Sequence, residues 1–374
     1  MTSYGNNIKI RIFGGSHDPE IGVVVENLPA GIKIDTDSLG AFMARRAPGQ
    51  SSLTTSRREA DIPIFESGVD GNMTTNGEIL RAVIKNTNMR SQDYSNLTSI
   101  PRPSHADYPA IIKSGGNVDL RGGGHFSGRL TAPMCIIGGI LKDELKKHGI
   151  HIGAHIASVG SVHDQRFDPV SVSRSDFESI LSHSLPLIDS SIENKIRECI
   201  ENAHAHLDSV GGVIECAAIG LPTGIGEHMF AGMEARISSI IFSIPAIKGI
   251  EFGAGFDSAA SFGSQNNDPY FTDGERVRTK TNNCGGILGG MTNGMPLIFR
   301  AAVKPTPSIG IEQDTVDLRS MKNVKVTVGG RHDPCIVPRV VPVFEAACAI
   351  AIYDALLDSN SPDLSESISK DDTK

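Results

Sequence analysis

The segment FGGSHDPE, residues 13–20, places a serine, a histidine and an aspartate next to one another. In a serine hydrolase these three groups converge from separate parts of the chain, and the serine sits on a Gly-x-Ser-x-Gly turn. The last position of that turn is Asp18 here, so a hydrolase has no nucleophile turn to support it. His17 is still of interest because imidazole exchanges protons near neutral pH, and the same holds for His105.

Other loops combine arginine, lysine or histidine with glycine or proline. They are residues 45–50 (RRAPGQ), 101–107 (PRPSHAD), 121–129 (RGGGHFSGR), 304–308 (KPTPS) and 330–334 (GRHDP). Proline fixes φ and glycine permits unusual backbone angles, so such loops can hold side chains in defined orientations. Arginine matches phosphate and carboxylate oxygens, and glycines just before an expected helix can direct backbone N–H groups at an anion. Together these loops predict a pocket for a small molecule with several negative charges.

The composition narrows the classes of partner. A net charge of −8, 5% aromatic residues and no tryptophan argue against a broad nucleic-acid-binding surface. The N-terminus shows no secretory signal pattern, and the apolar run Ala132–Leu141 is too short to span a bilayer. We therefore expect a cytoplasmic protein that binds neither nucleic acid nor membrane.

Common metal and nucleotide motifs do not fit the sequence. The six cysteines form no CxxC pair, and the three His-Asp dipeptides have no further metal-binding residues at helical spacing. The glycine clusters are not followed by Lys-Ser or Lys-Thr, and residues 253–258 lack the third glycine of a dinucleotide fingerprint. We expect reduced thiols and no metal site.

Hydrophobic patterning predicts the elements that position these loops. Strands are expected at residues 8–13, 22–25, 82–86, 150–159, 212–219, 296–303 and 324–328, and helices at 37–46, 127–147, 193–207, 232–242 and 342–357. The helices at 127–147 and 342–357 are apolar around most of their circumference, which is typical of helices inside a protein. Because strands and helices do not alternate regularly, we expect helices covered on more than one side and no doubly wound sheet.

Read in order, long segments of the chain resemble the signature regions of the chorismate synthase family. The resemblance runs from about Tyr4 to Leu357 and leaves residues 358–374 as a polar, disordered tail. The order and spacing of the segments argue against a chance match. They are FGGSHDPEIGVVVENLPAG, RRAPGQSSLTTSRREAD, NTNMRSQDYSNL, PRPSHADYP, RGGGHFSGRLTA, DSVGGVIE, SIPAIKGIEFGAGF, GSQNND, GGILGG, VKPTPSIG and GRHDPCIVPRVVPVFEA.

The resemblance implies both a fold and an activity. The implied fold is α+β, a β-α-β sandwich with a helical core between antiparallel sheets, formed by one catalytic domain over residues 1–357 and assembled as a homotetramer. The implied activity is the anti-1,4-elimination of phosphate and a ring proton from 5-enolpyruvylshikimate 3-phosphate to give chorismate, the last step of the shikimate pathway. The family requires reduced FMN. No reductase domain is apparent beside the family-length core, so we expect an external flavin reductase, with NADPH involved only indirectly.

Matching positions imply roles for individual residues. His17 matches the histidine proposed to protonate the reduced flavin, His105 the one proposed to protonate the departing phosphate, and Asp333 the aspartate proposed to act as a base by way of flavin N5. Substrate contacts are expected from Ser16, Arg46, Arg102, Arg129 and Arg331. Cofactor contacts are expected from His125, Phe126, Ser127, Pro245, Ala246, Gly289, Lys304, Pro305, Thr306, Pro307, Ser308 and Arg331.

Several residues depart from the commonest family pattern, among them Ala47 and Ser52, which stand where basic residues are frequent. In the first motif, Gly15 replaces a glutamate and Asp18 replaces a glycine. After the glycine run, His125 and Phe126 replace an arginine and a serine. The alternative to an active enzyme is therefore a catalytically weakened relative that binds flavin or an anionic ligand. Because the implied catalytic residues and the named arginines remain, we expect activity.

Overall fold

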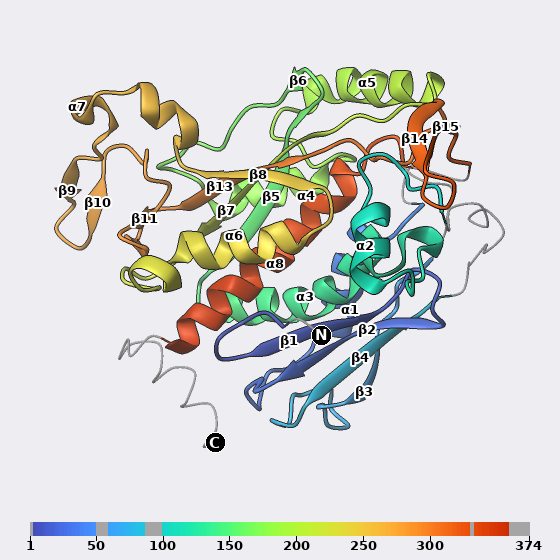
Figure 1. Cartoon of the computed structure of the whole chain (residues 1–374). Coiled ribbons are helices and arrows are strands. Elements are labelled where there is room, and N and C mark those ends of the chain that lie inside the picture. The colour runs from blue at the N-terminus through green and yellow to red at the C-terminus, as the bar shows by residue number, and fades with distance from the viewer. Residues whose placement is uncertain (1–2, 50–58, 87–98, 330–332, 359–374) are drawn as a thin grey trace.

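Two antiparallel sheets enclose a layer of helices, as Figure 1 shows. The computed structural model describes residues 3–49, 59–86, 99–329 and 333–358. The four-stranded sheet has the order β1-β2-β4-β3, and the five-stranded sheet has the order β6-β5-β7-β13-β8. Their strands are β1 (Lys9–Gly14), β2 (Glu20–Glu26), β3 (Ile64–Ser67), β4 (Leu80–Lys85), β5 (His151–Val159), β6 (Val162–His163), β7 (Gly212–Ile219), β8 (Ile247–Phe252) and β13 (Leu297–Val303). The α+β sandwich expected from the sequence is confirmed.

The layer between the sheets consists of α1 (Thr36–Arg46), α3 (Thr131–Lys147), α6 (Met233–Ser243) and α8 (Val337–Asp358). Helix α3 packs against α1 and α8 and contacts β2 and β4 of the first sheet. Helix α8 contacts α6 and also β5 and β7 of the second sheet. Buried apolar side chains of both sheets and of these helices form one continuous cluster. The two helices expected to be buried are thus the centre of the fold.

Helix α8 begins at Val337 rather than at Pro342, where the sequence analysis placed its start. Proline lacks an N–H and is disfavoured inside helices, but here the helix is buried on nearly all sides, so packing outweighs one lost hydrogen bond. With 22 residues, α8 is long and apolar enough to cross a membrane by length and composition alone, yet 94% of its apolar window is buried inside the protein. Such burial is what a core helix requires.

A buried ion cluster joins three of the core helices. Glu345 of α8 is 1% exposed and accepts hydrogen bonds at 2.8 and 2.6 Å from the two terminal nitrogen atoms of Arg45 in α1. Lys142 of α3 forms an ion pair with the same carboxylate. Burial opposes the ionised form of Glu345, but the two cations outweigh burial and lower its pKa to about 2. Helices α1, α3 and α8 are therefore joined by charge as well as by apolar packing.

Asp354, near the end of α8, binds the beginning of the chain. Its buried carboxylate accepts hydrogen bonds at 2.8–3.1 Å from the backbone N–H groups of Asn6, Asn7 and Ile8. Arg236 of α6 donates to it at 3.0 Å. The segment that leads into β1 is thus attached to the last helix.

Smaller elements surround the core. They are α2 (Asp107–Ser114), α4 (Arg174–Ser182), α5 (Glu193–Ala205), α7 (Gly263–Asn266), β9 (Tyr270–Thr272), β10 (Val277–Thr279), β11 (Ile287–Leu288), β12 (Met291–Thr292), β14 (Gln313–Asp317) and β15 (Lys322–Val326). Of these, hydrophobic patterning predicted α5 and β15, and in the sheets it missed β3, β6 and β8. β3 is largely exposed and β6 has two residues, so strand pairing decides their conformation more than residue type does. β8 has six residues and is mostly half-buried.

Candidate active site

A cavity of about 860 Å³ lies where the ends of several core elements meet. Its walls come from the loop after β1, the C-terminal ends of α1 and α6, the loop before α2, the glycine-rich turn at 121–126, the segment 304–308 and the start of α8. The predicted site residues in its lining are Ser16, His17, Arg46, Arg102, His105, His125, Phe126, Ser127, Arg129, Pro245, Ala246, Lys304, Thr306, Pro307, Ser308 and Asp333. The fold therefore brings together loops that are far apart in the sequence.

The remaining predicted site residues are not part of this lining. Gly289 lies in the turn between β11 and β12, with φ of +62°. Pro305 lies within the segment 304–308, but its ring is close to Gly211. Arg331 falls outside the described residues. Cofactor roles for these three residues stay predictions.

Two adjacent glycines lie beside the two predicted catalytic histidines. Gly122 has φ of +59°, and a Cβ atom at this position would overlap the ring of His17. Gly123 has φ of +90°, and a Cβ atom there would lie 3.4 Å from Nε2 of His105. Both residues adopt the left-handed conformation that favours glycine, and position 122 has no room for any side chain. The glycine run thus sets the places of His17 and His105 in the cavity wall.

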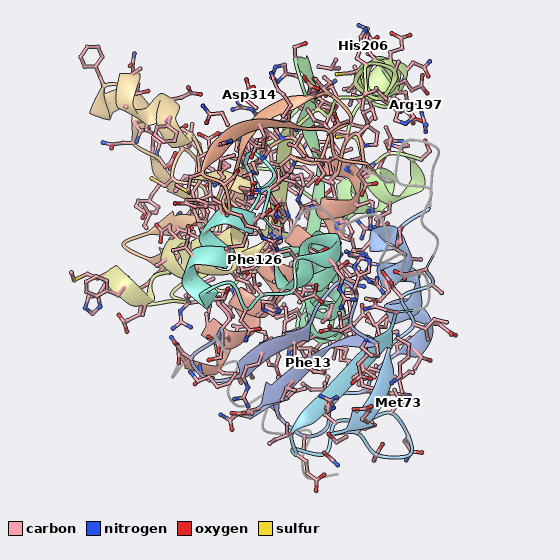
Figure 2. All side chains as sticks on the ribbon, turned by 45° about the vertical axis from the view of Figure 1, so that its right-hand side comes forward. Phe13, Met73, Phe126, Arg197, His206 and Asp314 are labelled. Carbon is pink, nitrogen blue, oxygen red and sulfur yellow. The ribbon has the colours of Figure 1, made fainter. Side chains whose placement is uncertain are left out.

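Hydrogen bonds join the glycine-rich turn to the loop after β1. The N–H of Ser16 donates to the carbonyl oxygen of Gly124 at 3.1 Å, and Nδ1 of His125 lies 2.9 Å from the carbonyl oxygen of Gly14. Phe126 is 41% exposed and lines the cavity. Figure 2 shows Phe126 near the middle of the molecule, above the sheet that carries Phe13. Of the two unusual residues, His125 therefore contacts the first loop and Phe126 adds an aromatic ring to the cavity wall.

The other unusual pair, Gly15 and Asp18, is also in contact. A Cβ atom at Gly15 would lie 3.2 Å from Oδ2 of Asp18. The N–H of Asp18 donates to the carbonyl oxygen of Gly15 at 3.1 Å. The carboxylate at position 18 therefore lies where a side chain at position 15 would begin.

A buried carboxylate joins His105 to Arg102. Oδ1 of Asp107, the first residue of α2, lies 2.5 Å from Nδ1 of His105. The same carboxylate accepts hydrogen bonds from the backbone N–H of Arg102 at 3.0 Å and from its guanidinium at 2.7 and 2.8 Å. Burial opposes ionisation of Asp107, but the hydrogen bonds from Arg102 and His105 outweigh it and hold its pKa far below the usual range. Arg102 also donates to Oγ of Ser308 at 3.2 Å, so this group reaches the segment 304–308.

Acidic residues that the sequence analysis did not assign hold the other two described arginines. One carboxylate oxygen of buried Asp61 accepts a hydrogen bond from Arg46 at 3.1 Å, and the other is paired with Arg129. Glu59 lies 3.2 Å from a terminal nitrogen of Arg129. Burial lowers the pKa of both arginines. A guanidinium has five N–H donors, so each arginine can be fixed by these carboxylates and still donate to an anion in the cavity.

Asp333 also has a basic neighbour that the sequence analysis did not single out. Its Oδ2 lies 2.5 Å from a terminal nitrogen of Arg339, which stands in the first turn of α8 and lines the cavity. Each of these unassigned residues lies in a segment that carried the family resemblance. RRAPGQSSLTTSRREAD contains Glu59 and Asp61, PRPSHADYP contains Asp107, and GRHDPCIVPRVVPVFEA contains Arg339. Their position in these segments was the available signal, but their contacts required the fold.

Lysines supply positive charge on another wall. Burial and the neighbouring charge of Lys248 lower the pKa of Lys304, and both residues line the cavity. Two ammonium groups in proximity repel each other, so an anion beside them is favourable. Pro245 and Ala246 adjoin this wall, as do residues 306–308. The wall can therefore hold a phosphate group of a ligand, and the cavity volume is in the range usual for small-molecule sites.

Comparisons with known proteins show which proteins this chain is similar to. The family model described as chorismate synthase matches residues 8–357. A curated relative from Lancefieldella parvula, named chorismate synthase, is 41% identical over 368 residues and covers 95% of this chain and 96% of the relative. A relative of the same name from Pyrococcus abyssi is 44% identical over 354 residues, covering 94% of this chain and 97% of the relative. A crystal structure described as chorismate synthase is similar with a TM-score of 0.76 at 26% identity, over 98% of this chain and 96% of that one.

Proposed function

The chain belongs to the chorismate synthase family, and we propose that it converts 5-enolpyruvylshikimate 3-phosphate to chorismate. It is accordingly a lyase of the shikimate pathway. In the proposed 1,4-elimination, the C–O bond to the phosphate breaks and one ring C–H bond breaks. The electron pair of the C–H bond enters the new diene, and the products are chorismate, phosphate and a proton. No net oxidation takes place.

The observation that carries this proposal is the convergence of His17, His105 and Asp333 on one cavity with several basic side chains. The substrate bears a phosphate and two carboxylates, so it needs cations to bind and proton-transfer groups to react. Within an acidic protein, this cavity offers both.

We assign the roles by the position of each group. His105 donates a proton from Nε2 to the departing phosphate while Arg102 balances its charge, which makes phosphate a better leaving group. Asp333 accepts the proton lost from the ring, and Arg339 holds its carboxylate in place. Arg46, with Arg129 as its neighbour across Asp61, binds carboxylate oxygens of the substrate.

The residues of the cavity also suit reduced FMN. When bound, the reduced flavin supplies electron density transiently as phosphate departs. Lys304 and Lys248 can pair with the phosphate group of the cofactor. Phe126 can contact the planar ring system of the flavin, and His17 can donate a proton to the flavin. An external reductase supplies the reduced flavin in this proposal, with NADPH as the indirect source of electrons.

We also propose a cytoplasmic homotetramer. Phe230, Phe256 and Phe262 are strongly exposed, at 91%, 83% and 77%. They belong to the segments 229–231 and 255–266, and Figure 1 draws the second of these close to the small hairpin of β9 and β10. Exposed apolar groups of this size are typical of surfaces that another chain covers. Light scattering at known protein concentration measures the mass of the assembly.

The unusual residues motivate the alternative of a catalytically weakened relative. Phe126 places an apolar ring in the cavity, and the Gly15–Asp18 pair changes the loop that carries His17. Such a protein would bind flavin or an anionic ligand without turnover. Binding and turnover must therefore be measured separately.

An anaerobic assay distinguishes the two proposals. Purified protein is mixed with reduced FMN and 5-enolpyruvylshikimate 3-phosphate, and phosphate and chorismate are followed with time. We expect both products in equal amounts, and we expect His105→Ala to slow phosphate release by about 10²- to 10⁴-fold, the usual contribution of a general acid, with flavin still bound. Tight flavin binding without product would contradict the lyase proposal and support the weakened relative.

A further inference from the structure

We propose that Asp107 is a positioning residue of this site: its carboxylate keeps a proton on Nδ1 of His105 and holds Arg102 beside that ring. A proton donor and a cation would then meet the departing phosphate as one unit. This inference rests on the proposed function. It concerns a residue to which neither the sequence pattern nor the family resemblance gave a role.

The local chain is folded so that these groups converge. Ser104 has φ of +58°, an uncommon value for a residue with a side chain, and it turns the backbone between Arg102 and His105. The N–H of His105 donates to the carbonyl oxygen of Arg102 at 3.3 Å. Asp107 then begins α2, where the positive end of the helix favours an ionised carboxylate.

The contacts of His105 indicate where its proton lies. Its Nδ1 is 2.5 Å from Oδ1 of Asp107 and 3.0 Å from a terminal nitrogen of Arg102. A guanidinium cannot accept a hydrogen bond, whereas the carboxylate can do nothing else when ionised. We therefore assign an N–H at Nδ1 that donates to Asp107. The other ring nitrogen, Nε2, is the one beside Gly123, on the cavity side.

The charges around His105 explain why a carboxylate is needed. Arg102 contacts the ring, and Nζ of Lys304 donates to the carbonyl oxygen of Ser104 from the opposite wall. His17 lies across the glycine pair. Asp107, which is fully buried and directly bonded to the ring, is the anion that faces these cations. The same carboxylate prevents Arg102 from turning away from the cavity.

The variant Asp107→Asn tests the proposal because it keeps the shape of the side chain and removes its charge. We expect turnover at neutral pH to fall by about 10²- to 10⁴-fold, the scale for loss of a correctly poised proton donor. We also expect the shape of the pH–rate profile to differ from that of the wild type, because the group that holds the proton on Nδ1 is lost. A merely structural role would lower the amount of active protein without moving this profile.

Glu215→Gln is the matched control. Glu215 is also a buried carboxylate that contacts a histidine and an arginine, with 2.9 Å to Nε2 of His155 and 3.3 Å to Arg300, but it does not line the cavity. We expect its pH–rate profile to coincide with that of the wild type. If Asp107→Asn does not fold, Asp107→Ala removes the carboxylate altogether. Wild-type turnover in that variant would overturn the proposal.

A chemical measurement decides the question without turnover. Diethyl pyrocarbonate acylates neutral imidazole, and mass spectrometry of peptides reports modification at His105 in ligand-free protein. We expect the rate of modification in Asp107→Asn to differ from that in the wild type, and no change in Glu215→Gln. Equal rates in all three proteins would overturn the role of Asp107. If the wild type fails to make chorismate, the proposed function fails while this measurement still tests the contact.

Discussion

The carboxylate of Asp333 lies 2.5 Å from a terminal nitrogen of Arg339, and Nε of Arg339 donates to the carbonyl oxygen of Arg46 at 3.2 Å. One guanidinium thus connects the proposed base to the end of α1. It does so from the first turn of α8, the helix at the centre of the fold. The base is held by the core of the protein as well as by its own loop.

Replacing Arg339 should therefore slow catalysis. We expect Arg339→Met to lower turnover by about 10- to 100-fold, since a hydrogen bond to a charged group contributes about 1.5–3 kcal/mol. Arg339→Lys should lower turnover less than Arg339→Met does, because lysine keeps the positive charge. Steady-state rates under anaerobic conditions measure both. Arg197→Met is the control, because Arg197 forms its ion pair with Glu193 on peripheral α5; equal rates for the Arg339 and Arg197 variants would contradict the prediction.

Gly122 should tolerate no side chain. In Gly122→Ala the new methyl group meets the His17 ring and the residue must also adopt a left-handed φ. We expect weaker flavin binding, measured by the fluorescence of oxidised FMN, by about tenfold or more, because a cost of 1.4 kcal/mol corresponds to a factor of ten. Gly115→Ala is the matched control, since Gly115 has φ of +62° with no atom within 4 Å of its added Cβ. If both variants bind FMN alike, steric contact with His17 is not the cause.

The Gly15–Asp18 pair should behave as a unit. Gly15→Glu places a second carboxylate beside Asp18, and like charges about 4 Å apart in water repel by roughly 1 kcal/mol. We expect a loss of about that size in the free energy of unfolding, measured with urea. The double variant Gly15→Glu/Asp18→Gly should regain the lost free energy of unfolding. A double variant as unstable as Gly15→Glu would show that the two positions are independent.

Loss of Glu345 should destabilise the core strongly. Glu345→Gln leaves Arg45 and Lys142 without their shared carboxylate, and breaking a buried pair costs about 3–5 kcal/mol. Urea unfolding at pH 7 measures this loss. The exposed ion pair of Glu178 with Arg174 supplies the control, and Glu178→Gln should change stability by less than about 1 kcal/mol.

The same residue predicts a pH dependence. The folded-state pKa of Glu345, about 2, lies below its ordinary value of 4.5. A lowered carboxyl pKa contributes stability that is complete above the ordinary value and is lost as the pH falls towards the folded value. We therefore expect the difference in stability between wild type and Glu345→Gln to shrink between pH 4.5 and pH 2. A constant difference across this range would contradict the assignment.

Much of the fold could be predicted because long apolar patterns determine it. The strands β5, β7 and β13 and the buried helices α3 and α8 are mostly apolar in sequence, so the pattern of hydrophobic residues predicted these elements. β3 and β9 could not be predicted in this way. Their side chains are mostly exposed, and only pairing with a neighbouring strand gives them their conformation.

The sequence allowed the residues of the site to be predicted, but it did not allow the contacts between their side chains to be predicted. Family motifs named His105 and Asp333, and both line the cavity. The partners Asp107 and Arg339 were visible as residues two and six positions further along the chain, yet separation along a loop does not tell which side chains meet. The positive φ of Ser104 and the early start of α8 make these contacts possible, and both are properties of the folded backbone.

The bond between Asp354 and the backbone of residues 6–8 has a consequence for the order of folding. A ribosome makes the N-terminal segment first, but its anchor belongs to the last helix, more than 340 residues later. The first sheet can pair its strands and contact α3 earlier, yet the segment that leads into β1 cannot be anchored until α8 has been made. Contacts of such long sequence separation slow folding and leave partly folded chains exposed. Native structure at the start of β1 should therefore appear only after α8 has been made, and a protein cut before α8 should fail to hold β1 in place.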